Sequence, residues 1–261
     1  MTHTHSVADD ATRLLALHED PALLTVVNVW DPISATVVSD EPGTRALATA
    51  SHSIAASFGY EDGEKIPLDL HLQAIERIVQ ATPHPVSADL EGGYGDAAET
   101  VRRAIGVGVV GANIEDQLKP LDEAAAQVAA IVKAGETEGI RFVLNARTDA
   151  FTIGGGRDPE VALADAVERG RAYLDAGAPV VFVPGKLDEH QVETLVEAFG
   201  PQKLTVIAVP GSLSLARLEQ LGVARVSYGP WSQRVALTAL QDLVRDVHAG
   251  GGLPEGTRPL N

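Results

Sequence analysis

VSADLEGGYGD, residues 86–96, places two acids, Asp89 and Glu91, at the end of a short apolar run and follows them with a pair of glycines. In an extended strand, residues two apart point to the same side, so we expect both carboxylates to face one way. Glycine leaves the neighbouring backbone bare, which suits a bound ligand or metal ion. The segment therefore predicts a strand that ends at a polar site.

Short β-rich runs of this kind alternate with longer helical patterns along the chain. Most runs are apolar on both faces, which is typical of parallel strands covered by helices. The runs are 23–29, 45–50, 85–90, 109–115, 141–147, 179–184, 204–210 and 224–229. Eight strand–helix units in roughly 250 residues predict a single α/β (β/α)8 barrel of the TIM type. An open doubly wound sheet is the alternative, but NVWDPIS after the first run is not a glycine-rich dinucleotide motif.

The domain organisation follows from the absence of a Pro- or Gly-rich linker, so we expect residues 1–261 to form one barrel domain. Residues 1–20 are expected to form a helical lead-in, 231–249 the terminal helix, and 250–261 a flexible tail. The pattern of 158–177 predicts a helix that Asp158 caps, with Pro159 at its first position and its end near Gly177.

The composition narrows the class of partner. A net charge of −16, from 36 acids against 20 bases, argues against nucleic acid and anionic membranes, because phosphate contacts need clustered Lys and Arg. The chain has no cysteine, which excludes disulfides and a thiolate zinc site. No apolar run reaches the roughly 20 residues of a membrane span, and the first residues lack a signal-peptide pattern. We expect a cytoplasmic enzyme or binding protein with a small-molecule ligand.

Polar side chains gather where the predicted strands end, which is the edge that carries the chemistry in barrels of this type. Asp89, Glu91 and Glu115 lie at two neighbouring ends, and clustered carboxylates without His or Cys favour Mg²⁺ or Mn²⁺. A bound cation would also relieve the repulsion between them. The alternative is that each acid caps the helix that follows its strand.

Other candidates lie at the same edge. The planar fork of Arg147 suits a substrate carboxylate or phosphate, although Arg147 could instead pair with Glu115 or Asp149 to hold the barrel rim. His52, after the second run, could act as a general acid or base, although a lone histidine is more often a structural donor. The other histidines are assigned no role.

Four motifs carry a resemblance to a known family. SFGYEDGEKIP, VSADLEGGYGD, GANIEDQ and NARTDAF occur in an order and spacing similar to those of the phosphoenolpyruvate mutase/isocitrate lyase superfamily. The resemblance runs from about Leu24 to about Val247. It implies a TIM-type barrel whose last helix is often exchanged between subunits of a homodimer or homotetramer. It also implies a Mg²⁺-dependent enzyme that makes or breaks a C–C or C–P bond of a 2-oxo acid through an enolate.

The resemblance assigns roles by motif position. Asp89 resembles the main metal ligand, and Glu91 replaces a second acid that is usually Asp. Asp62 resembles an acid that supports the waters bound to the metal. Glu115 resembles the glutamate in the metal's outer shell, and Arg147 resembles the arginine that binds the substrate carboxylate. Ala50 and Ser51 match the backbone that holds the oxo-acid oxygens. Trp30 and Asp31 are expected to bind substrate for a different reason, because they lie at the end of the first predicted strand, at the barrel mouth.

The sequence departs from the family in the loop after the fourth predicted strand. It lacks the Lys-x-Cys-Gly-His loop of the isocitrate lyases, and Gln117 stands where the mutases carry a gating lysine. We therefore expect a Mg²⁺-dependent lyase that cleaves or forms a C–C bond in a small 2-oxo or 2-hydroxy acid. His52, Tyr94 or a water held by the metal would donate the proton. A C–P bond enzyme and a non-catalytic oxo-acid-binding barrel remain the alternatives.

Overall fold

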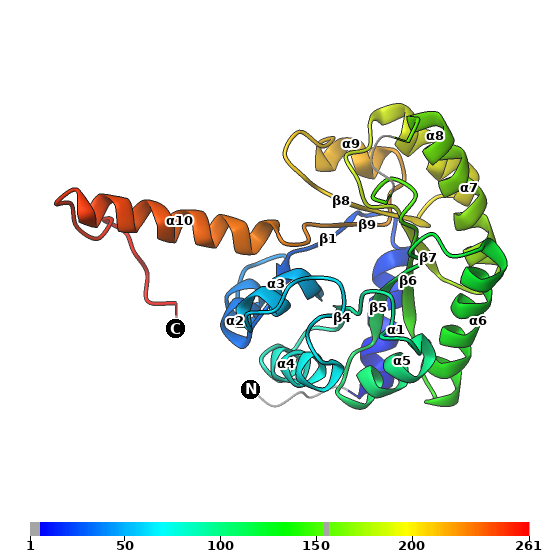
Figure 1. The fold of residues 1–261 in the computed structure, drawn as a ribbon, viewed down its shortest axis with the longest axis horizontal. Coiled ribbons are helices and arrows are strands. Elements are labelled where there is room, and N and C mark those ends of the chain that lie inside the picture. Colours follow the sequence, from blue (N-terminus) through cyan, green and yellow to red (C-terminus); the bar gives the residue numbers. More distant parts are fainter. Residues whose placement is uncertain (1–5, 154–156, 261) are drawn as a thin grey trace.

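The computed structural model describes residues 6–153 and 157–260 of the chain. Residues 1–5 of the predicted helical lead-in and residue 261 of the predicted tail lie outside the described part. Within it, the chain alternates strands and helices from end to end (Figure 1).

The strands form one parallel sheet that curls into a barrel. Among the described residues it has nine strands in the order β1-β9-β8-β7-β6-β5-β4-β3-β2. Their bounds are β1 Leu24–Val26, β2 Asn28–Val29, β3 Leu47–Thr49, β4 Val86–Asp89, β5 Gly111–Glu115, β6 Val143–Arg147, β7 Val180–Phe182, β8 Leu204–Ile207 and β9 Arg225–Ser227. The two ends of this order, β1 and β2, are consecutive in the chain, so the sheet is nearly closed. The prediction of a single α/β barrel of the TIM type is confirmed.

The first strand of the barrel differs from its predicted form. Residues 23–29 were expected to make one strand, but the structure divides it at Val27, which is exposed. β1 pairs with β9, whereas β2 pairs with β3. Because of this division, the segment 24–29 supplies the strands at both ends of the sheet order and brings these ends together.

Helices cover the outside of the barrel. Their bounds are α1 Val7–Glu19, α2 Pro32–Ser39, α3 Ser51–Ser57, α4 Leu68–Gln80, α5 Ala97–Gly106, α6 Leu121–Thr137, α7 Pro159–Asp175, α8 Glu189–Phe199, α9 Leu215–Gln220 and α10 Trp231–His248. α7 begins as predicted, with the Asp158 side chain accepting from the Glu160 amide and Pro159 in the first turn. Gly177, two residues after its end, has a φ of 100°, which glycine adopts without strain.

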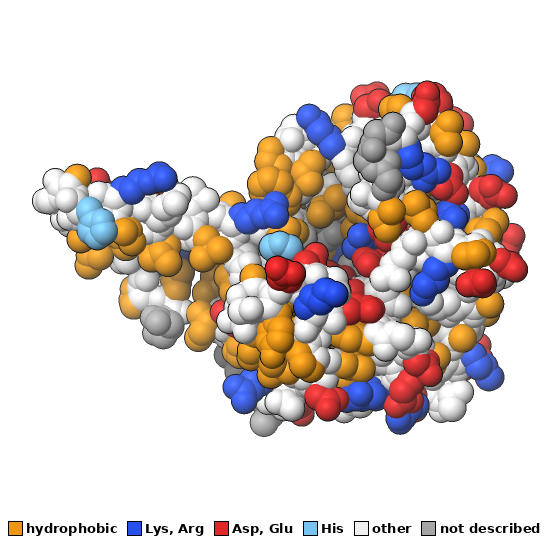
Figure 2. All heavy atoms as spheres, viewed as in Figure 1, with side chains coloured by type: hydrophobic (Ala, Val, Ile, Leu, Met, Phe, Trp, Pro, Cys, Tyr) orange, Lys and Arg blue, Asp and Glu red, His pale blue; other side chains and the backbone are white. Residues whose placement is uncertain are grey.

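The last helix, α10, projects away from the barrel (Figure 1). Only Gln233 of its residues is buried, and Val235, Leu237, Leu240, Val244 and Val247 are exposed. Figure 2 shows apolar side chains along this helix and acidic side chains around a hollow in the barrel face. Within residues 6–153 and 157–260, no helix has both the length and the apolar character needed to cross a membrane.

Candidate active site

The carboxyl ends of β4, β5 and β6 bring the predicted strand-end residues together. Asp89 on β4 lies opposite Asn113 on β5. Two residues further toward the rim, Glu115 on β5 lies opposite Arg147 on β6. The parallel register therefore places the three charged side chains at one edge of the barrel.

Asp89 is held by the start of α3. Its Oδ2 accepts a hydrogen bond from the Ser51 hydroxyl at 2.8 Å and from the Ser51 amide at 3.1 Å. The Ala50 amide donates to the Val29 carbonyl at 3.3 Å. The two amides that the family resemblance assigned to substrate oxygens thus already have partners within the protein, and Ser51 orients Asp89.

Glu91 joins two loops. It is buried and has a left-handed φ of 54°. Its Oε2 accepts from the Glu64 amide, while Oε1 of Glu64 accepts from the Tyr94 amide at 2.7 Å. Burial raises the pKa of Glu91 to about 7, and the charges of Asp89, Asp62 and Glu64 act in the same direction. The exposed loop that carries Asp62 is therefore fastened to the VSADLEGGYGD segment by a reciprocal pair of hydrogen bonds.

A buried histidine lies behind this loop. The Tyr94 hydroxyl is 2.9 Å from Nδ1 of His71 and 3.4 Å from Oε1 of Glu91. His71 on α4 is fully buried, and burial lowers its pKa to about 4. The sequence assigned no role to His71, because its position on the apolar face of a helix does not indicate that Tyr94, 23 residues away, is its partner. Tyr94 therefore connects a neutral buried imidazole to the acidic site.

Arg147 lies between two acids. Its Nη1 is 2.7 Å from Oε2 of Glu115, and its Nη2 is 2.7 Å from Oδ1 of Asp149. Nε also donates to Oδ1 of Asp149, at 2.8 Å. Burial raises the pKa of Glu115 to about 7, although the Arg147 charge opposes this change. The pairing with Glu115 and Asp149 that the sequence left open is present, and it fixes the orientation of the guanidinium.

The short loop after β5 is anchored by Asp116. Its Oδ2 accepts from the Tyr173 hydroxyl at 2.6 Å and from Nη1 of Arg169 at 3.2 Å. Its Oδ1 accepts from the amides of Leu118 and Asp149. Gln117 and Leu118 both have a left-handed φ, of 51° and 53°. Non-glycine residues adopt this conformation infrequently, and the bond from the Leu118 amide to Asp116 holds this part of the loop.

The glycine pair in the opening segment has a more specific reason than the sequence indicated. A Cβ at Gly92 would lie 2.4 Å from Nε2 of Gln117, so the bare backbone accommodates this amide. Gly93 has a φ of 94°, and a Cβ there would lie 2.4 Å from Cβ of Ala97. The residue at the position of the family's gating lysine thus packs directly over the acidic loop.

The remaining predicted residues lie on neighbouring elements. Asp31 caps α2, its Oδ1 accepting from the Ser34 amide at 2.7 Å, and Trp30 packs half-buried against the core. His52 lies next to Ser51 on α3, and its Nδ1 is buried without a hydrogen-bond partner in the described part of the chain. No contact joins His52 to the strand-end acids among the described residues.

Helix capping separates the acids into two groups. Asp31, Asp96, Asp158 and Asp188 cap α2, α5, α7 and α8 through their side chains. Asp89, Glu91 and Glu115 do not cap α5 or α6, the described helices that follow their strands, although Asp89 accepts from the first amide of α3. The capping alternative therefore accounts for the first group and leaves the strand-end acids for another purpose.

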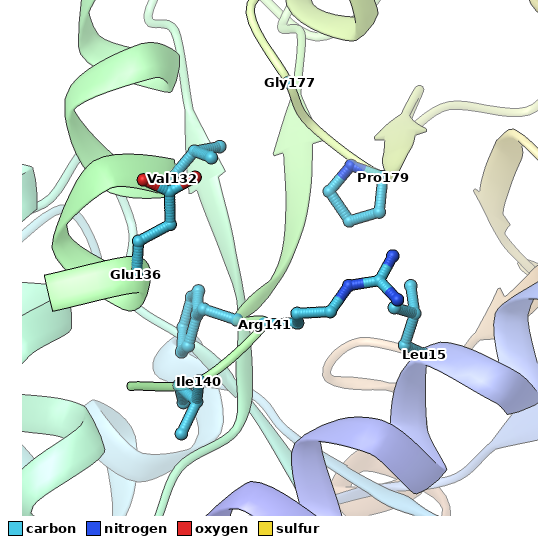
Figure 3. A pocket seen from close by; sticks show the side chains of 8 residues that line it. Leu15, Val132, Glu136, Ile140, Arg141, Gly177 and Pro179 are labelled. Atoms are coloured by element: carbon cyan, nitrogen blue, oxygen red, sulfur yellow. The ribbon is translucent and has the colours of Figure 1, made fainter. Parts of the chain in front are cut away.

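A second cleft lies at the opposite, amino-terminal end of the barrel. It has a volume of about 150 Å³ and lies between α1, α6 and the segments that precede β6 and β7. Figure 3 shows Arg141 extending toward Leu15 and Pro179 in this cleft. Its lining includes none of the strand-end residues, so the candidate active site remains at the carboxyl edge.

A parallel barrel with charged side chains at the carboxyl ends of neighbouring strands is characteristic of (β/α)8-barrel enzymes. The chain belongs to the phosphoenolpyruvate phosphomutase family, whose model matches residues 14–248. The predicted membership of the phosphoenolpyruvate mutase/isocitrate lyase superfamily is confirmed.

Named relatives include enzymes that act on small carboxylic acids. An oxaloacetate decarboxylase of Pseudomonas aeruginosa is 30% identical over 240 residues, covering 88% of this chain and 83% of its own. The structure of oxaloacetate acetylhydrolase with 3,3-difluorooxalacetate has a TM-score of 0.85 and 25% identity, covering 97% of this chain and 91% of its own. That of 2,3-dimethylmalate lyase has a TM-score of 0.83 and 26% identity, covering 96% and 92%. The chain is an enzyme, and the prediction of a carbon–carbon lyase agrees with these relatives.

Proposed function

We propose that this enzyme is a Mg²⁺-dependent lyase that cleaves or forms a C–C bond in a small 2-oxo or 2-hydroxy acid through an enolate. The observation that carries the proposal is the meeting of Asp89, Glu91 and Glu115 beside Arg147 at the carboxyl edge of the barrel. This arrangement offers negative charge to a cation and positive charge to a carboxylate. The relatives that act on oxaloacetate and 2,3-dimethylmalate support this class of substrate.

The donor set fits a hard divalent cation. Glu91 and Glu115 are largely buried, and each has a pKa of about 7 that neighbouring acids help to raise. A cation would relieve this repulsion. Among residues 6–153 and 157–260, no three acidic or histidine side chains enclose a metal site. Mg²⁺ does not require such an enclosure, because proteins commonly hold it through one or two carboxylates and several waters. Asp89 would bind it directly, and Glu91, Asp62 and Glu115 would act on its waters.

When bound, Mg²⁺ would polarise the substrate and offset the negative charge that develops when the bond breaks. Arg147 binds the carboxylate side of the substrate, and Glu115 and Asp149 keep its fork in one orientation. A fixed guanidinium stabilises a developing anion without the cost of reorientation. Bond cleavage leaves an enolate that requires a proton, and Tyr94 is the candidate donor with a hydroxyl next to Glu91.

C–P bond chemistry is the second candidate, because the family model takes its name from phosphoenolpyruvate phosphomutase. The substitution of Gln117 for the gating lysine argues against it. The third candidate is a non-catalytic barrel that binds oxo acids without turnover. The exposed Gln117 and its short loop favour this candidate, since a poorly covered site does not exclude water from an enolate.

The test is turnover of a substrate panel with and without Mg²⁺. Oxaloacetate, methylisocitrate and phosphonopyruvate are supplied, pyruvate and glyoxylate are measured, and phosphorus NMR follows the phosphonate. We expect product from a C–C substrate, its loss in excess chelator, and a loss of about 10³-fold in kcat for Asp89→Asn. Asp122→Asn, an exposed acid on α6, is the matched control. Turnover of phosphonopyruvate alone would favour C–P chemistry, and Mg²⁺-dependent binding of oxalate without turnover would favour the binding barrel.

We also propose that the protein is a homodimer or homotetramer in which α10 packs against another copy. The exposed apolar face of α10, on a helix that leaves the barrel, supports this arrangement. A contiguous apolar surface of this kind is typical of an interface.

A further inference from the structure

The interior of the barrel contains a buried positive charge. Arg225 on β9 is 1% exposed, and its Nη1 donates to the Ser87 hydroxyl on β4 at 3.0 Å. In the strand order of the sheet, β9 and β4 are not neighbours. The guanidinium therefore spans the barrel interior. Asn113, Asn145 and Thr205 form a separate hydrogen-bonded row there, of which Arg225 is not a part.

Among the described residues, this charge has no direct counter-ion. Nε and Nη2 of Arg225 are buried and have no hydrogen-bond partner in the described part of the chain. His18 on α1 is near enough for Arg225 to disfavour its charged form. Burial is the larger cause, and the two together lower the His18 pKa to about 3, so the imidazole is neutral. A buried, unpaired guanidinium is costly, so its retention requires a compensating interaction.

The acidic site supplies that interaction. Ser87 and Asp89 are two residues apart on β4, so both side chains face the same side of the strand, with Ser87 deeper in the barrel. Burial lowers the pKa of Arg225 to about 10, and the Asp89 charge opposes this change. Arg225 thus lies beneath the carboxylate that the proposed function assigns to the cation, and the two charges attract across the interior.

We propose that Arg225 is a positioning residue of the active site, whose buried charge beneath Asp89 weakens the hold of the acid cluster on a divalent cation and strengthens its hold on an anionic substrate. The proposal rests on the proposed function. A fixed positive charge repels the cation and attracts the carboxylate, and both effects are strong in a poorly screened interior. Removal of the charge should therefore raise the affinity for the cation and lower the affinity for the anion. A purely structural role would differ, because a loosened site would bind both ligands less well.

The experiment measures Mg²⁺ binding by calorimetry at pH 8 without substrate, and oxalate binding in saturating Mg²⁺. We expect Arg225→Met to bind Mg²⁺ about tenfold more tightly and oxalate about tenfold more weakly than the original chain. Arg225→Lys, which keeps the charge, should stay close to the original chain in both measurements. Ser87→Ala, which removes only the hydrogen-bond acceptor, should do the same.

Circular dichroism establishes that each variant is folded. If Arg225→Met does not fold, Arg225→Gln removes the charge while keeping a donor for Ser87, and it should show the same two opposite changes. Unchanged or weaker Mg²⁺ binding by a folded neutral variant would overturn the role of Arg225 and leave the proposed function in place. Failure of the original chain to bind Mg²⁺ would overturn both.

Discussion

Tyr94 and His71 share a hydrogen bond of 2.9 Å that joins the loop of the candidate active site to the interior of α4. A tyrosine hydroxyl has one proton to donate, and an ionised glutamate only accepts. When Glu91 is ionised, Tyr94 donates to Glu91 and the Nδ1 proton of His71 is donated to Tyr94. The neutral state of His71 permits this tautomer, which directs the Tyr94 proton toward the acidic site.

Replacement of Tyr94 by Phe should lower kcat by about 10²-fold, which is the contribution of a positioned proton donor. The change in KM should be small, because the ring and its packing remain. Steady-state kinetics on the best substrate of the panel measures both constants. Tyr60→Phe, at an exposed position in the preceding loop, is the control. A Tyr94→Phe variant with full kcat would remove Tyr94 as the donor.

Replacement of Asp116 by Asn should destabilise the protein by about 3 kcal/mol. The Asp116 side chain is buried, and its loss as an anion leaves Arg169 with only the partly exposed Asp165 as an ion-pair partner. Urea unfolding measures the difference. Asp122→Asn, on the exposed side of α6, should change the free energy of unfolding by less than about 0.5 kcal/mol. Equal stability of the two variants would show that Asp116 does not anchor the loop.

The stability of the protein should depend on pH through His18. Its pKa is about 3 in the fold and 6.5 in the unfolded chain, so unfolding takes up a proton between these values. The contribution of His18 is complete above pH 6.5 and is lost as the pH falls toward 3. Because Glu91 and Glu115 change stability in the opposite sense over part of this range, the comparison is between variants.

His18→Gln keeps a donor for the Leu14 carbonyl but does not titrate. Between pH 6.5 and pH 5 the original chain should lose about 2 kcal/mol more stability than this variant. Denaturant unfolding at both pH values checks the difference, with His190→Gln as an exposed control. Parallel pH profiles for the original chain and His18→Gln would contradict the assignment.

Replacement of Leu240 by Glu should dissociate the proposed oligomer. Leu240 is 55% exposed on α10, in the middle of its apolar face, and a charge there would have to be buried in the interface. Light scattering should give a smaller mass for this variant than for the original chain. Gln241→Glu, which adds the same charge one residue away on the polar side, should keep the original mass. A monomeric original chain would end the proposal of packing through α10.

The parts of the site that the sequence predicted are those fixed by strand ends. Asp89, Glu115 and Arg147 each lie at the end of an apolar run. The carboxyl ends of parallel strands meet at one edge of the barrel, so these residues come together there irrespective of the loops and helices between them. The division of the first strand at Val27 had no such signal, because the run is apolar throughout.

The supporting residues could not be found in the same way. Glu64 reaches Glu91 from 27 residues away, and Arg225 reaches Ser87 from 138 residues away. No local pattern encodes such a contact, since each residue alone is equally compatible with a solvated surface position.

The fastening of Glu64 to Glu91 links the loop of Asp62 to the proposed cation site. The Glu64 amide donates to Oε2 of Glu91, and a carboxylate oxygen has a second lone pair with which it can accept from a metal-bound water. Glu91 would then hold the loop and a water of the cation at the same time, so binding of the cation and ordering of the loop would favour each other by the same free energy.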